Sequence, residues 1–322
     1  MKVLHIIRSK SESAIAPFIT KQVQSLQELG VEAEIFQVQG KGVLSYLKNS
    51  LPLRRFIRSG QFDLIHAHYS LCGLTAILAF SGKPIVLSLM GSDALGEFTG
   101  PHKISLRSLP VVWLTRIIQP FVSAIIVKSE NIRQKVYRKS ITEIIPNGVN
   151  LERFKPENKM DARKALGLQP NKKYILFLAN PTHQWKNFGL AEQAVQLLND
   201  AETELLTPYP VGSELVAKYM NAADVLVHTS FMEGSSNVIK EAMACNCPIV
   251  ATHVGDAAWV IGETEGCYIT GFNPSEVSEK LKLALSFASN SNSTNGHNQI
   301  LNLKLDTTSS AKKILNLYNQ LV

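Results

Sequence analysis

Hydrophobic residues in the first half of the chain fall into short apolar runs that alternate with amphipathic segments. Lys2–Ile7 is a run ended by charge, which indicates a strand, and Pro17–Leu29 repeats apolar residues at helical spacing before Gly30. Five more runs predict strands: Ala33–Val38, Phe62–His68, Pro84–Leu89, Ala124–Lys128 and Ile141–Ile145. Strands separated by helices favour a doubly wound parallel α/β sheet, which binds ligands beyond the carboxyl ends of its strands.

The second half resumes the same alternation after a break at Pro146–Pro156, where a Pro-Asn-Gly turn and a terminal proline indicate a linker. Its predicted strands are Tyr174–Ala179, Asp224–His228, Pro248–Thr252 and Gly266–Thr270, and its predicted helices are Asn187–Leu198, Ser213–Asn221, Pro274–Phe287 and Thr307–Leu321. Residues 288–299 are polar and of low complexity, so we expect a mobile loop there.

The most informative stretch is Phe231–Val250, which predicts a tight turn, a short helix and a strand after the apolar run that ends at His228. Gly234 allows the turn. The three residues that follow, Ser235, Ser236 and Asn237, are all preferred at a helix N-terminus. The free amides and the dipole of such an N-terminus favour a bound anion.

Two carboxylates flank this predicted anion site. Glu233 lies at the edge of the turn, and Glu241 follows eight residues later inside the helix. Carboxylates on either side of a phosphate can accept hydrogen bonds from hydroxyl groups, which favours a phosphorylated, polyhydroxylated ligand such as a sugar nucleotide. Taken alone, the two positions are more typical of a turn residue and a solvated helix residue than of a ligand site.

The whole string from Glu233 is more specific. Glu-Gly-Ser-x-Asn-x-x-x-Glu-Ala-Met-Ala, followed by Cys-Pro-Ile-Val, closely resembles the donor-site signature of family 4 retaining glycosyltransferases. Pro146–Pro156, the loop of Lys186 and Asn221–Asp224 resemble further motifs of that family in the same order. Within the family, the chain is most similar to members that assemble bacterial surface polysaccharides of the teichuronic acid or exopolysaccharide type.

The resemblance implies two Rossmann-like domains that face a cleft, the arrangement called GT-B. Residues 1–158 would bind the acceptor, residues 159–304 would bind a nucleotide-diphosphate sugar, and a C-terminal helix within 305–322 would cross back to the first domain. The implied acceptor is a glycan or a polyprenyl-phosphate-linked sugar. The implied compartment is the cytoplasm, at the inner face of the plasma membrane.

The resemblance also assigns roles in the second half of the chain. Glu241 would hold the ribose and Glu233 the donor sugar. Lys186 and the turn from Gly234 to Asn237 would stabilise the departing diphosphate. The implied reaction is a hexosyl transfer that retains the anomeric configuration, uses UDP or GDP as the nucleotide, and needs neither a cofactor nor a metal ion.

The chain departs from the family pattern at three places. The arginine that usually precedes the lysine of the Lys186 loop is absent, so either Lys186 and the helix N-terminus suffice or a cation such as Arg8 completes the phosphate site. The loop Arg8–Ala14 lacks the paired glycines of the family, although its polar, cationic character suits an acceptor phosphate. Met90 stands where many members have a histidine near the reacting sugar.

Other polar residues follow predicted strands on the acceptor side. His66 and His68 lie on one face of their strand, with His68 nearer its carboxyl end, where an active-site role and a buried structural role are both open. Asp93 follows the next strand and would be either an acceptor-side residue or a helix N-cap. Gly255-Asp256 has the same place in the second half, as a ligand contact or as a turn and cap.

Charge is distributed unevenly over the 322 residues. The net charge of +7 comes from +9 in residues 1–158 and −2 in residues 159–322, so the first half is the candidate for contact with an acidic partner such as anionic lipid. There is no apolar run long enough to span a membrane, and the first strand does not have the pattern of a signal peptide. The four cysteines have no metal-binding spacing and fit packing in a reducing cytoplasm.

Two segments of the first half are basic and amphipathic, Tyr46–Arg58 and His102–Val122. They fit either helices that lie in a membrane interface or half-buried helices around an acceptor site. We expect a nucleotide-sugar donor as a partner and no nucleic acid.

Two other classes of function remain open. One is another nucleotide-sugar enzyme of the same architecture, such as an epimerase, and the other is a non-catalytic nucleotide-sugar-binding assembly protein. A dinucleotide dehydrogenase is disfavoured, because neither half has Gly-x-Gly-x-x-Gly after its first strand.

Overall fold

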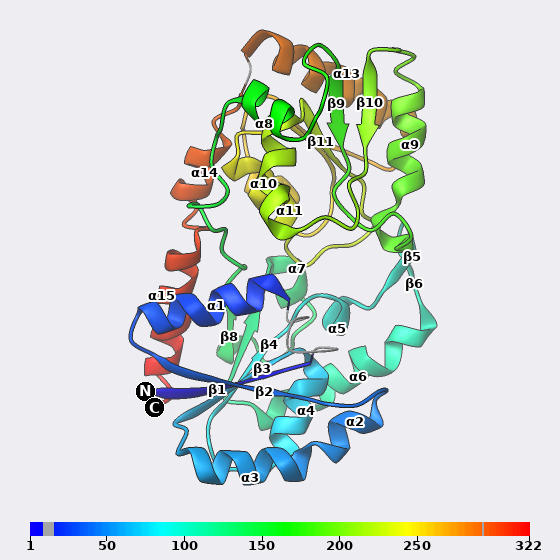
Figure 1. Cartoon of the computed structure of the whole chain (residues 1–322). Coiled ribbons are helices and arrows are strands. Elements are labelled where there is room, and N and C mark those ends of the chain that lie inside the picture. Colours follow the sequence, from blue (N-terminus) through cyan, green and yellow to red (C-terminus); the bar gives the residue numbers. More distant parts are fainter. Residues whose placement is uncertain (9–15, 292) are drawn as a thin grey trace. The chain divides into compact units, whose positions relative to one another are not determined.

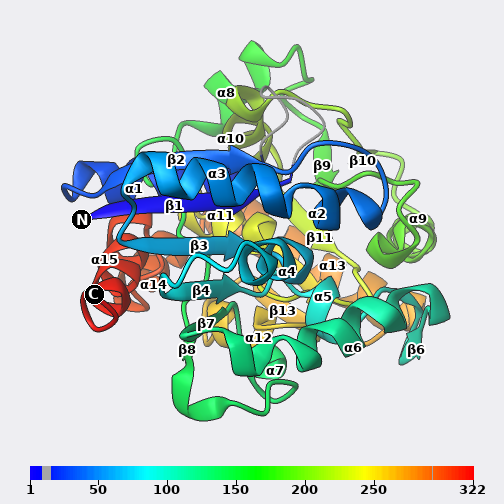
Figure 2. The same cartoon turned by 90° about the horizontal axis from the view of Figure 1, so that it is seen from below.

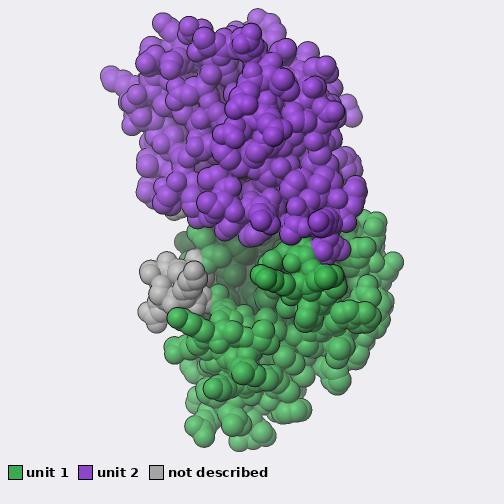
Figure 3. Space-filling model, turned by 90° about the vertical axis from the view of Figure 1, so that its right-hand side faces the viewer, with its two compact units in different colours: residues 1–97, 105–148, 307–322 green, residues 98–104, 149–306 purple. Residues whose placement is uncertain are grey.

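The computed structural model describes residues 1–8, 16–291 and 293–322, which divide into two compact units (Figure 3). Unit 1 comprises residues 1–97, 105–148 and 307–322, and unit 2 comprises residues 98–104 and 149–306. The predicted α/β class with parallel sheets is confirmed, because each unit contains its own parallel sheet and its own core. Among the described residues, no helix is both long and apolar enough to cross a bilayer.

Unit 1 is built on a six-stranded parallel sheet in the order β2-β1-β3-β4-β7-β8 (Figures 1 and 2). Its strands are β1 (Lys2–Ile7), β2 (Glu32–Gln37), β3 (Leu64–His68), β4 (Ile85–Ser88), β7 (Ala124–Val127) and β8 (Thr142–Ile144). Its α-helices are α1 (Pro17–Glu28), α2 (Leu44–Lys48), α3 (Ser50–Gly60), α4 (Ser70–Leu78), α5 (Ser92–Leu95), α6 (Leu109–Ile117), α7 (Glu130–Arg133) and α15 (Thr307–Asn319).

Alternating strand residues of unit 1 enter two separate cores. Val3 of β1 and Leu64 of β3 pack with Ile314 and Tyr318 of α15, and α15 lies beside α1 on that face (Figure 1). The next residue of each strand, such as Leu4, faces the helices of the other layer. The C-terminal helix therefore belongs to unit 1.

Unit 2 is built on a five-stranded parallel sheet in the order β10-β9-β11-β12-β13. Its strands are β9 (Lys173–Leu176), β10 (Thr203–Leu206), β11 (Val225–His228), β12 (Ile249–Thr252) and β13 (Cys267–Thr270), with a separate small hairpin of β5 (Phe98–Gly100) and β6 (Lys103–Ile104). Its α-helices are α8 (Lys159–Ala165), α9 (Phe188–Gln196), α10 (Ser213–Ala222), α11 (Asn237–Ala244), α12 (Ala257–Ile261), α13 (Pro274–Ser291) and α14 (Gly296–Asn302).

The division of the chain differs from the predicted boundary at residue 158. Val149 donates its backbone N–H to Leu305 (2.8 Å), and both Val149 and Phe154 are buried in the core of unit 2. The Pro-Asn-Gly turn therefore ends unit 1 at Gly148, and the rest of the predicted linker already packs in unit 2. The hairpin β5–β6 was not predicted.

The mobile loop expected at residues 288–299 is a wrong prediction, because most of these residues are helical. α13 continues to Ser291, and α14 begins at Gly296. Asn246 anchors this region by accepting the backbone N–H of Thr294 (3.0 Å) and, through its side chain, that of His297 (2.7 Å). Polar composition misled the prediction, because tertiary hydrogen bonds and the buried side chain of Ile300 order the segment.

Candidate functional site

The turn between β11 and α11 is the centre of the candidate site, and its strand–turn–helix–strand order is as predicted. The strand ends at His228 and the helix begins at Asn237, with Ser236 as its N-cap residue. The hydroxyl of Ser236 lies 3.1 Å from Nε2 of His228, so the end of the strand and the start of the helix are tied together. Ser235 and Gly234 complete the turn.

A second loop, which carries Lys186, is fastened to this turn. The hydroxyl of Thr229 lies 3.1 Å from the carbonyl oxygen of Lys186, and the N–H of Phe231 donates to the carbonyl of Trp185 (2.8 Å). The 3-10 helix Gln184–Lys186 therefore lies at the carboxyl end of the sheet of unit 2, beside the turn.

Glu233 and Lys186 form an ion pair at the junction of these two loops. Oε1 of Glu233 lies 2.6 Å from Nζ of Lys186 and 3.3 Å from Nε2 of His228. The Glu233 side chain is only 15% exposed, and burial alone would raise its pKa. The charge of Lys186 and the hydrogen bond from His228 outweigh burial and hold the pKa of this carboxyl well below its usual range.

Glu233 is therefore an ionised acceptor at neutral pH. Two residues that the sequence analysis assigned to one ligand are brought into direct contact with each other. The sequence analysis did not assign a role to His228. The one sequence feature that indicates such a role is its position as the last residue of a buried strand, directly before the turn.

Glu241 lies in α11 and is partly buried. Burial raises the pKa of its carboxyl to about 7, and the nearby positive charges of Lys240 and Arg153 oppose that shift. The side chain is thus not an ordinary solvated helix residue. It is a carboxyl that titrates near neutral pH.

A buried amine and a buried acid lie behind the same turn. Lys240 is 0% exposed, and its Nζ donates to Oγ of Ser235 (3.0 Å). Asp256 follows β12 and is 9% exposed, and burial raises the pKa of its carboxyl. Gly255 adopts a left-handed φ of +59°, and a side chain there would approach the carbonyl oxygens of Glu233 and Gly234 to 3.0 Å.

The predicted pair Gly255-Asp256 therefore packs directly against the turn. Lys240 was missed by the sequence analysis, although a lysine among the apolar residues of a short helix is a signal that could have found it.

The acceptor-side candidates all lie in unit 1, where His68 belongs to a buried histidine cluster. Nε2 of His68 lies 3.0 Å from Nδ1 of His5, and the ring of His66 stacks on that of His68 with centroids 4.2 Å apart. Burial lowers the pKa of all three, with that of His5 at about 3, so the rings are neutral.

The three imidazoles are close enough to be considered as metal ligands. Both ring nitrogens of His66 are, however, already hydrogen-bonded, Nε2 to the hydroxyl of Ser88 (2.7 Å) and Nδ1 to that of Tyr318. The stacked rings of His66 and His68 also cannot direct in-plane lone pairs at one ion. The arrangement supports packing of β3 against α15 better than it supports a metal centre.

Asp93 is fully buried and binds backbone. Its carboxylate accepts hydrogen bonds from the N–H groups of Met90 (2.9 Å), Gly91 (3.0 Å) and Ser70 (3.1 Å), and from the Ser70 hydroxyl. Burial raises its pKa and these hydrogen bonds oppose the rise. Asp93 lies inside α5 after the N-cap Gly91, and it joins the loop after β4 to the start of α4.

Arg8 holds a neighbouring loop of unit 1. Its guanidinium donates to the carbonyl oxygens of Gly40 (2.9 Å) and Gly42 (3.3 Å) and lies over the ring of Tyr46. The rest of the loop predicted to suit an acceptor phosphate, residues 9–14, lies outside the described residues.

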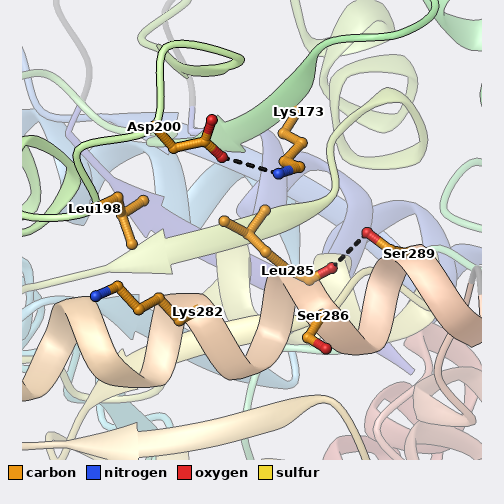
Figure 4. Close-up of a pocket in the computed structure, with 7 residues that line it drawn as sticks. All are labelled: Lys173, Leu198, Asp200, Lys282, Leu285, Ser286 and Ser289. Atoms are coloured by element: carbon orange, nitrogen blue, oxygen red, sulfur yellow. Dashed lines mark hydrogen bonds and ion pairs between the residues drawn. The ribbon is translucent and has the colours of Figure 1, made fainter.

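A pocket of about 220 Å³ lies elsewhere in unit 2, between Lys173, Asp200 and residues of α13 such as Lys282 (Figure 4). Lys173 pairs with Asp200 (2.9 Å) and is the first residue of β9. The pocket is therefore at the amino ends of the strands, whereas the β11–α11 turn is at their carboxyl ends. It does not include the candidate site.

Two family models, both of glycosyltransferases, match successive parts of the chain. The sequence model of the family described as Glycosyltransferase Family 4 matches residues 21–153, and the one described as Glycosyl transferases group 1 matches residues 189–286.

Two curated relatives share 26% identity with the chain. TuaC of Bacillus subtilis (strain 168), which is assigned to teichuronic acid biosynthesis as a glycosyltransferase, matches over 62% of this chain and 56% of its own length. D-inositol 3-phosphate glycosyltransferase 2 of Catenulispora acidiphila matches over 67% of this chain and 61% of its own length. The chain thus spans less than two thirds of the length of these relatives.

Solved structures share the fold over the whole chain at low sequence identity. Sucrose-phosphate synthase from Thermosynechococcus elongatus aligns with a TM-score of 0.81 at 17% identity, covering 99% of this chain and 98% of that one. HepE from Anabaena, solved in complex with UDP and glucose, aligns with a TM-score of 0.73 at 18% identity over the full length of both chains. These matches confirm the GT-B fold.

Proposed function

This chain belongs to glycosyltransferase family 4, and on that premise we propose that it transfers a sugar from a nucleotide-diphosphate sugar to a glycan or polyprenyl-phosphate-linked acceptor. We place the reaction in the assembly of a bacterial surface polysaccharide, in the cytoplasm at the inner face of the plasma membrane. The observation that carries the proposal is the cluster of Glu233, Lys186 and His228 at the N-terminus of α11.

The donor site is proposed in unit 2. Lys186 and the first-turn amides of α11 would bind the diphosphate, because a helix N-terminus and an ammonium group both favour an anion. When phosphate oxygens share the ammonium of Lys186, His228 would still hold the Glu233 carboxylate in place, because its Nε2 lies 3.3 Å from Oε1. Glu233 would then accept hydrogen bonds from hydroxyl groups of the donor sugar.

Glu241 would accept the hydroxyl groups of the ribose from inside the same helix. A nucleotide bound in this way spans the turn, with its ribose at Glu241 and its sugar at Glu233. We propose UDP or GDP as the nucleotide, and the Anabaena protein HepE, solved with UDP and with UDP-glucose, supports a donor of this class.

Catalysis in this proposal is electrostatic. The bond between the sugar and the diphosphate breaks as negative charge grows on the leaving phosphate, and Lys186 with the α11 amides stabilises that charge. We propose that the anomeric configuration is retained and that neither a metal ion nor a cofactor takes part, because the positive charge needed by the leaving group is supplied by the chain itself.

We propose that the acceptor reaches the enzyme at a membrane surface. The exposed apolar residues in and around α6 support this proposal. Four large apolar residues of this region are exposed: Trp113 and Ile117 lie one turn apart on one side of α6, and Leu106 and Phe121 lie in the 3-10 turns that precede and follow it. In that order, they are 60%, 63%, 80% and 63% exposed. An apolar patch of this size is costly to leave in water and is typical of an interaction surface.

Cations border the patch, as expected for anionic lipid. The guanidinium of Arg116 lies 5.7 Å from the centroid of the Trp113 ring, and Arg107 is exposed beside Leu106 in the sequence. The other basic segment exposes Leu47 and Leu51 but no aromatic side chain, and Leu53 and Ile57 of α3 are buried in the core. Of the two candidates, α6 is therefore the one that we propose contacts the headgroups.

The proposed function is tested by donor binding and then by turnover. A thermal-shift screen of UDP-, GDP-, ADP- and CMP-sugars should give a rise in melting temperature with one nucleotide, because a ligand that binds only the folded state stabilises it by mass action. The rise should be lost in Glu241→Ala. No shift with any donor would contradict the donor site.

Turnover of the labelled donor that binds then separates the classes of function. Transfer of the label to an acceptor supports a glycosyltransferase. Conversion to a different sugar nucleotide would indicate an epimerase, and binding without turnover would indicate an assembly protein.

A further inference from the structure

Lys240 lies at the proposed donor site, but the proposed function gives it no role. Its side chain is completely buried, and it is among the largest fully buried side chains of the chain. Side chains in an α-helix lean toward the helix N-terminus, so an ammonium group that starts from residue 240 lies under the turn before Asn237. The 3.0 Å hydrogen bond from its Nζ to Oγ of Ser235 confirms this direction.

Three acidic side chains around the turn interact electrostatically with this amine. Asp256 comes from the loop after β12, Glu233 from the turn itself and Glu241 from α11. Lys186 and His228 lie beyond them and pair with Glu233. Burying a cation is unfavourable unless nearby charges compensate it, so a buried lysine at a candidate ligand site calls for a reason in charge rather than in packing.

We propose that Lys240 is the second cation of the diphosphate site, a positioning residue that holds the Ser235 turn and places positive charge beneath the N-terminus of α11. It takes the place of the arginine that the Lys186 loop lacks. This inference rests on the proposed function, because it assumes that a nucleotide diphosphate binds at the turn.

The charge of Lys240 depends on what is bound. Burial lowers the pKa of its amine to about 8, and the charges of Asp256, Glu241 and Glu233 oppose that lowering. A diphosphate bound at the turn adds negative charge above the amine. Like the three carboxylates, this charge raises the pKa of Lys240, which favours the protonated amine. Binding at pH 8 to 9 should therefore be accompanied by proton uptake.

Thermodynamic linkage connects this uptake to affinity. If the bound anion raises the pKa of Lys240 by about one unit, the protonated protein binds the anion about tenfold more tightly than the deprotonated protein. At pH 8.5 the same shift corresponds to the uptake of about half a proton per nucleotide. Ionisation of Glu241 has the opposite sign and occurs near pH 7, so a measurement at pH 8.5 reports mainly on the lysine.

The test is calorimetric titration of the full chain with UDP, or with the nucleotide diphosphate that the thermal-shift screen selects. Titrations at pH 8.5 in buffers of different ionisation enthalpy measure the protons taken up. We expect about half a proton for the parent, none for Lys240→Met, and none for Lys240→Arg, because the guanidinium is already protonated. Lys282→Met, at the exposed pocket near the amino end of β9, is the matched control and should behave like the parent.

Affinities at pH 7.5 separate a charge effect from a structural one. Lys240→Met should weaken diphosphate binding by about tenfold. Binding of uridine, which carries no phosphate, should stay within about twofold, and Lys240→Arg should recover diphosphate binding. Equal losses for the diphosphate and for uridine would mean that Lys240 only maintains the fold of the turn, and the inference would be wrong.

The two proposals fail in different ways. If the parent binds no nucleotide diphosphate, the proposed function fails. If the parent binds the diphosphate without proton uptake and Lys240→Met binds it equally well, the donor site stands and the role of Lys240 is overturned.

Discussion

Glu233 shows how a single side chain acquires its chemistry from its neighbours. A buried carboxyl would by itself favour its protonated form, but the contacts with Lys186 (2.6 Å) and His228 (3.3 Å) reverse that preference. The carboxylate is thus held ionised and in one orientation before any ligand arrives. A site prepared in this way needs little reorganisation when charge develops during the reaction.

Replacing this carboxylate should therefore affect turnover more than nucleotide affinity. We expect Glu233→Gln to lower kcat by about 100-fold or more, because the amide keeps the shape but cannot stabilise developing charge on the sugar. The Kd of the free nucleotide should change little. Steady-state kinetics and calorimetry measure the two quantities, and Glu204→Gln, in an exposed ion pair on β10, is the control. A parent-like kcat would remove Glu233 from the mechanism.

Glu241 should make donor binding depend on pH. Because burial raises the pKa of this carboxyl to about 7, the ionised form that accepts ribose hydroxyls is lost as pH falls through 7. The KM for the donor should rise accordingly between pH 8 and pH 6. Glu241→Gln should bind the donor more weakly at pH 8 and lose this pH dependence, and a variant that kept the profile of the parent would refute the assignment.

The same pKa shift affects the stability of the unliganded protein. A carboxyl whose pKa is raised on folding opposes folding once it ionises, so its cost is absent below about pH 4.5 and complete above about pH 7. Relief of about 1 kcal/mol in Glu241→Gln at pH 8 would raise the melting temperature by about 2–4 °C in a protein of this size. The difference from the parent should shrink as pH falls toward 4.5, as melting curves at several pH values would show.

At the scale of secondary structure, α6 is unusual because it exposes Trp113 and Ile117, while Val111 and Leu114 pack on the core and the polar Thr115 is buried. Thr115 is buried, and its hydroxyl lies 2.6 Å from the carbonyl oxygen of Asp93 and 2.7 Å from the hydroxyl of Ser70. These contacts orient the helix, and they leave Trp113 and Ile117 exposed on the other side. The buried hydrogen bonds between Thr115, Asp93 and Ser70 thus determine which side of α6 is exposed on the surface of unit 1.

Removing the exposed patch should abolish membrane binding and leave donor binding intact. We expect Trp113→Glu/Ile117→Glu to lower partitioning onto vesicles of phosphatidylglycerol and phosphatidylethanolamine by about tenfold or more, because apolar burial is lost and like charge is added. Sedimentation with the vesicles measures this, with phosphatidylcholine vesicles as the uncharged comparison. Trp259→Glu, a 51% exposed tryptophan on α12 of unit 2, is the control. Equal partitioning of all three proteins would contradict the role of α6.

Helix α14 provides a further prediction for the packing of unit 2. A methyl group at Gly296 would lie 2.6 Å from the backbone carbonyl oxygen of Met243, whereas Gly189 in α9 has open space around the same position. Gly296→Ala should therefore destabilise unit 2 by about 1–3 kcal/mol. Gly189→Ala should be neutral or stabilise by up to about 1 kcal/mol, because alanine favours a helix. Urea unfolding compares the two, and equal effects would show that α14 can move aside.

At the scale of the whole molecule, unit 1 depends on both ends of the chain. Ile314 and Tyr318 of α15 pack against Val3 and Leu64, and the Tyr318 hydroxyl contacts His66. Unit 2, by contrast, has cores formed entirely by residues 149–306. Loss of the C-terminal helix α15 should therefore destabilise unit 1 but not the cores of unit 2.

Deleting residues 307–322 should unfold unit 1 and spare the core of unit 2. The deletion exposes one face of the unit 1 sheet and leaves the histidine cluster without its tyrosine partner. Hydrogen exchange should then be fast in peptides from β1 and β3 and remain slow in peptides from β11 and β12. Slow exchange in β1 after the deletion would show that α15 is dispensable.

The sequence by itself determined the fold class, the parallel strands and the turn before α11, because these depend on local periodicity and on residues such as Gly234 that a turn requires. It also singled out Glu233, Lys186 and Glu241 as candidates. It misplaced the boundary of the first unit and took residues 288–299 for a mobile loop, since packing of Val149 and hydrogen bonds to Asn246 decide those features.

Only the tertiary structure decided which charges meet. The contacts of Glu233 with Lys186 and His228 span 47 and 5 positions of the chain, and the proximity of Lys240 to Asp256 depends on two strands lying side by side. The same holds for which side of α6 is exposed. Periodicity shows that a helix has two faces, but the face that is buried is chosen by what the rest of the chain packs against it.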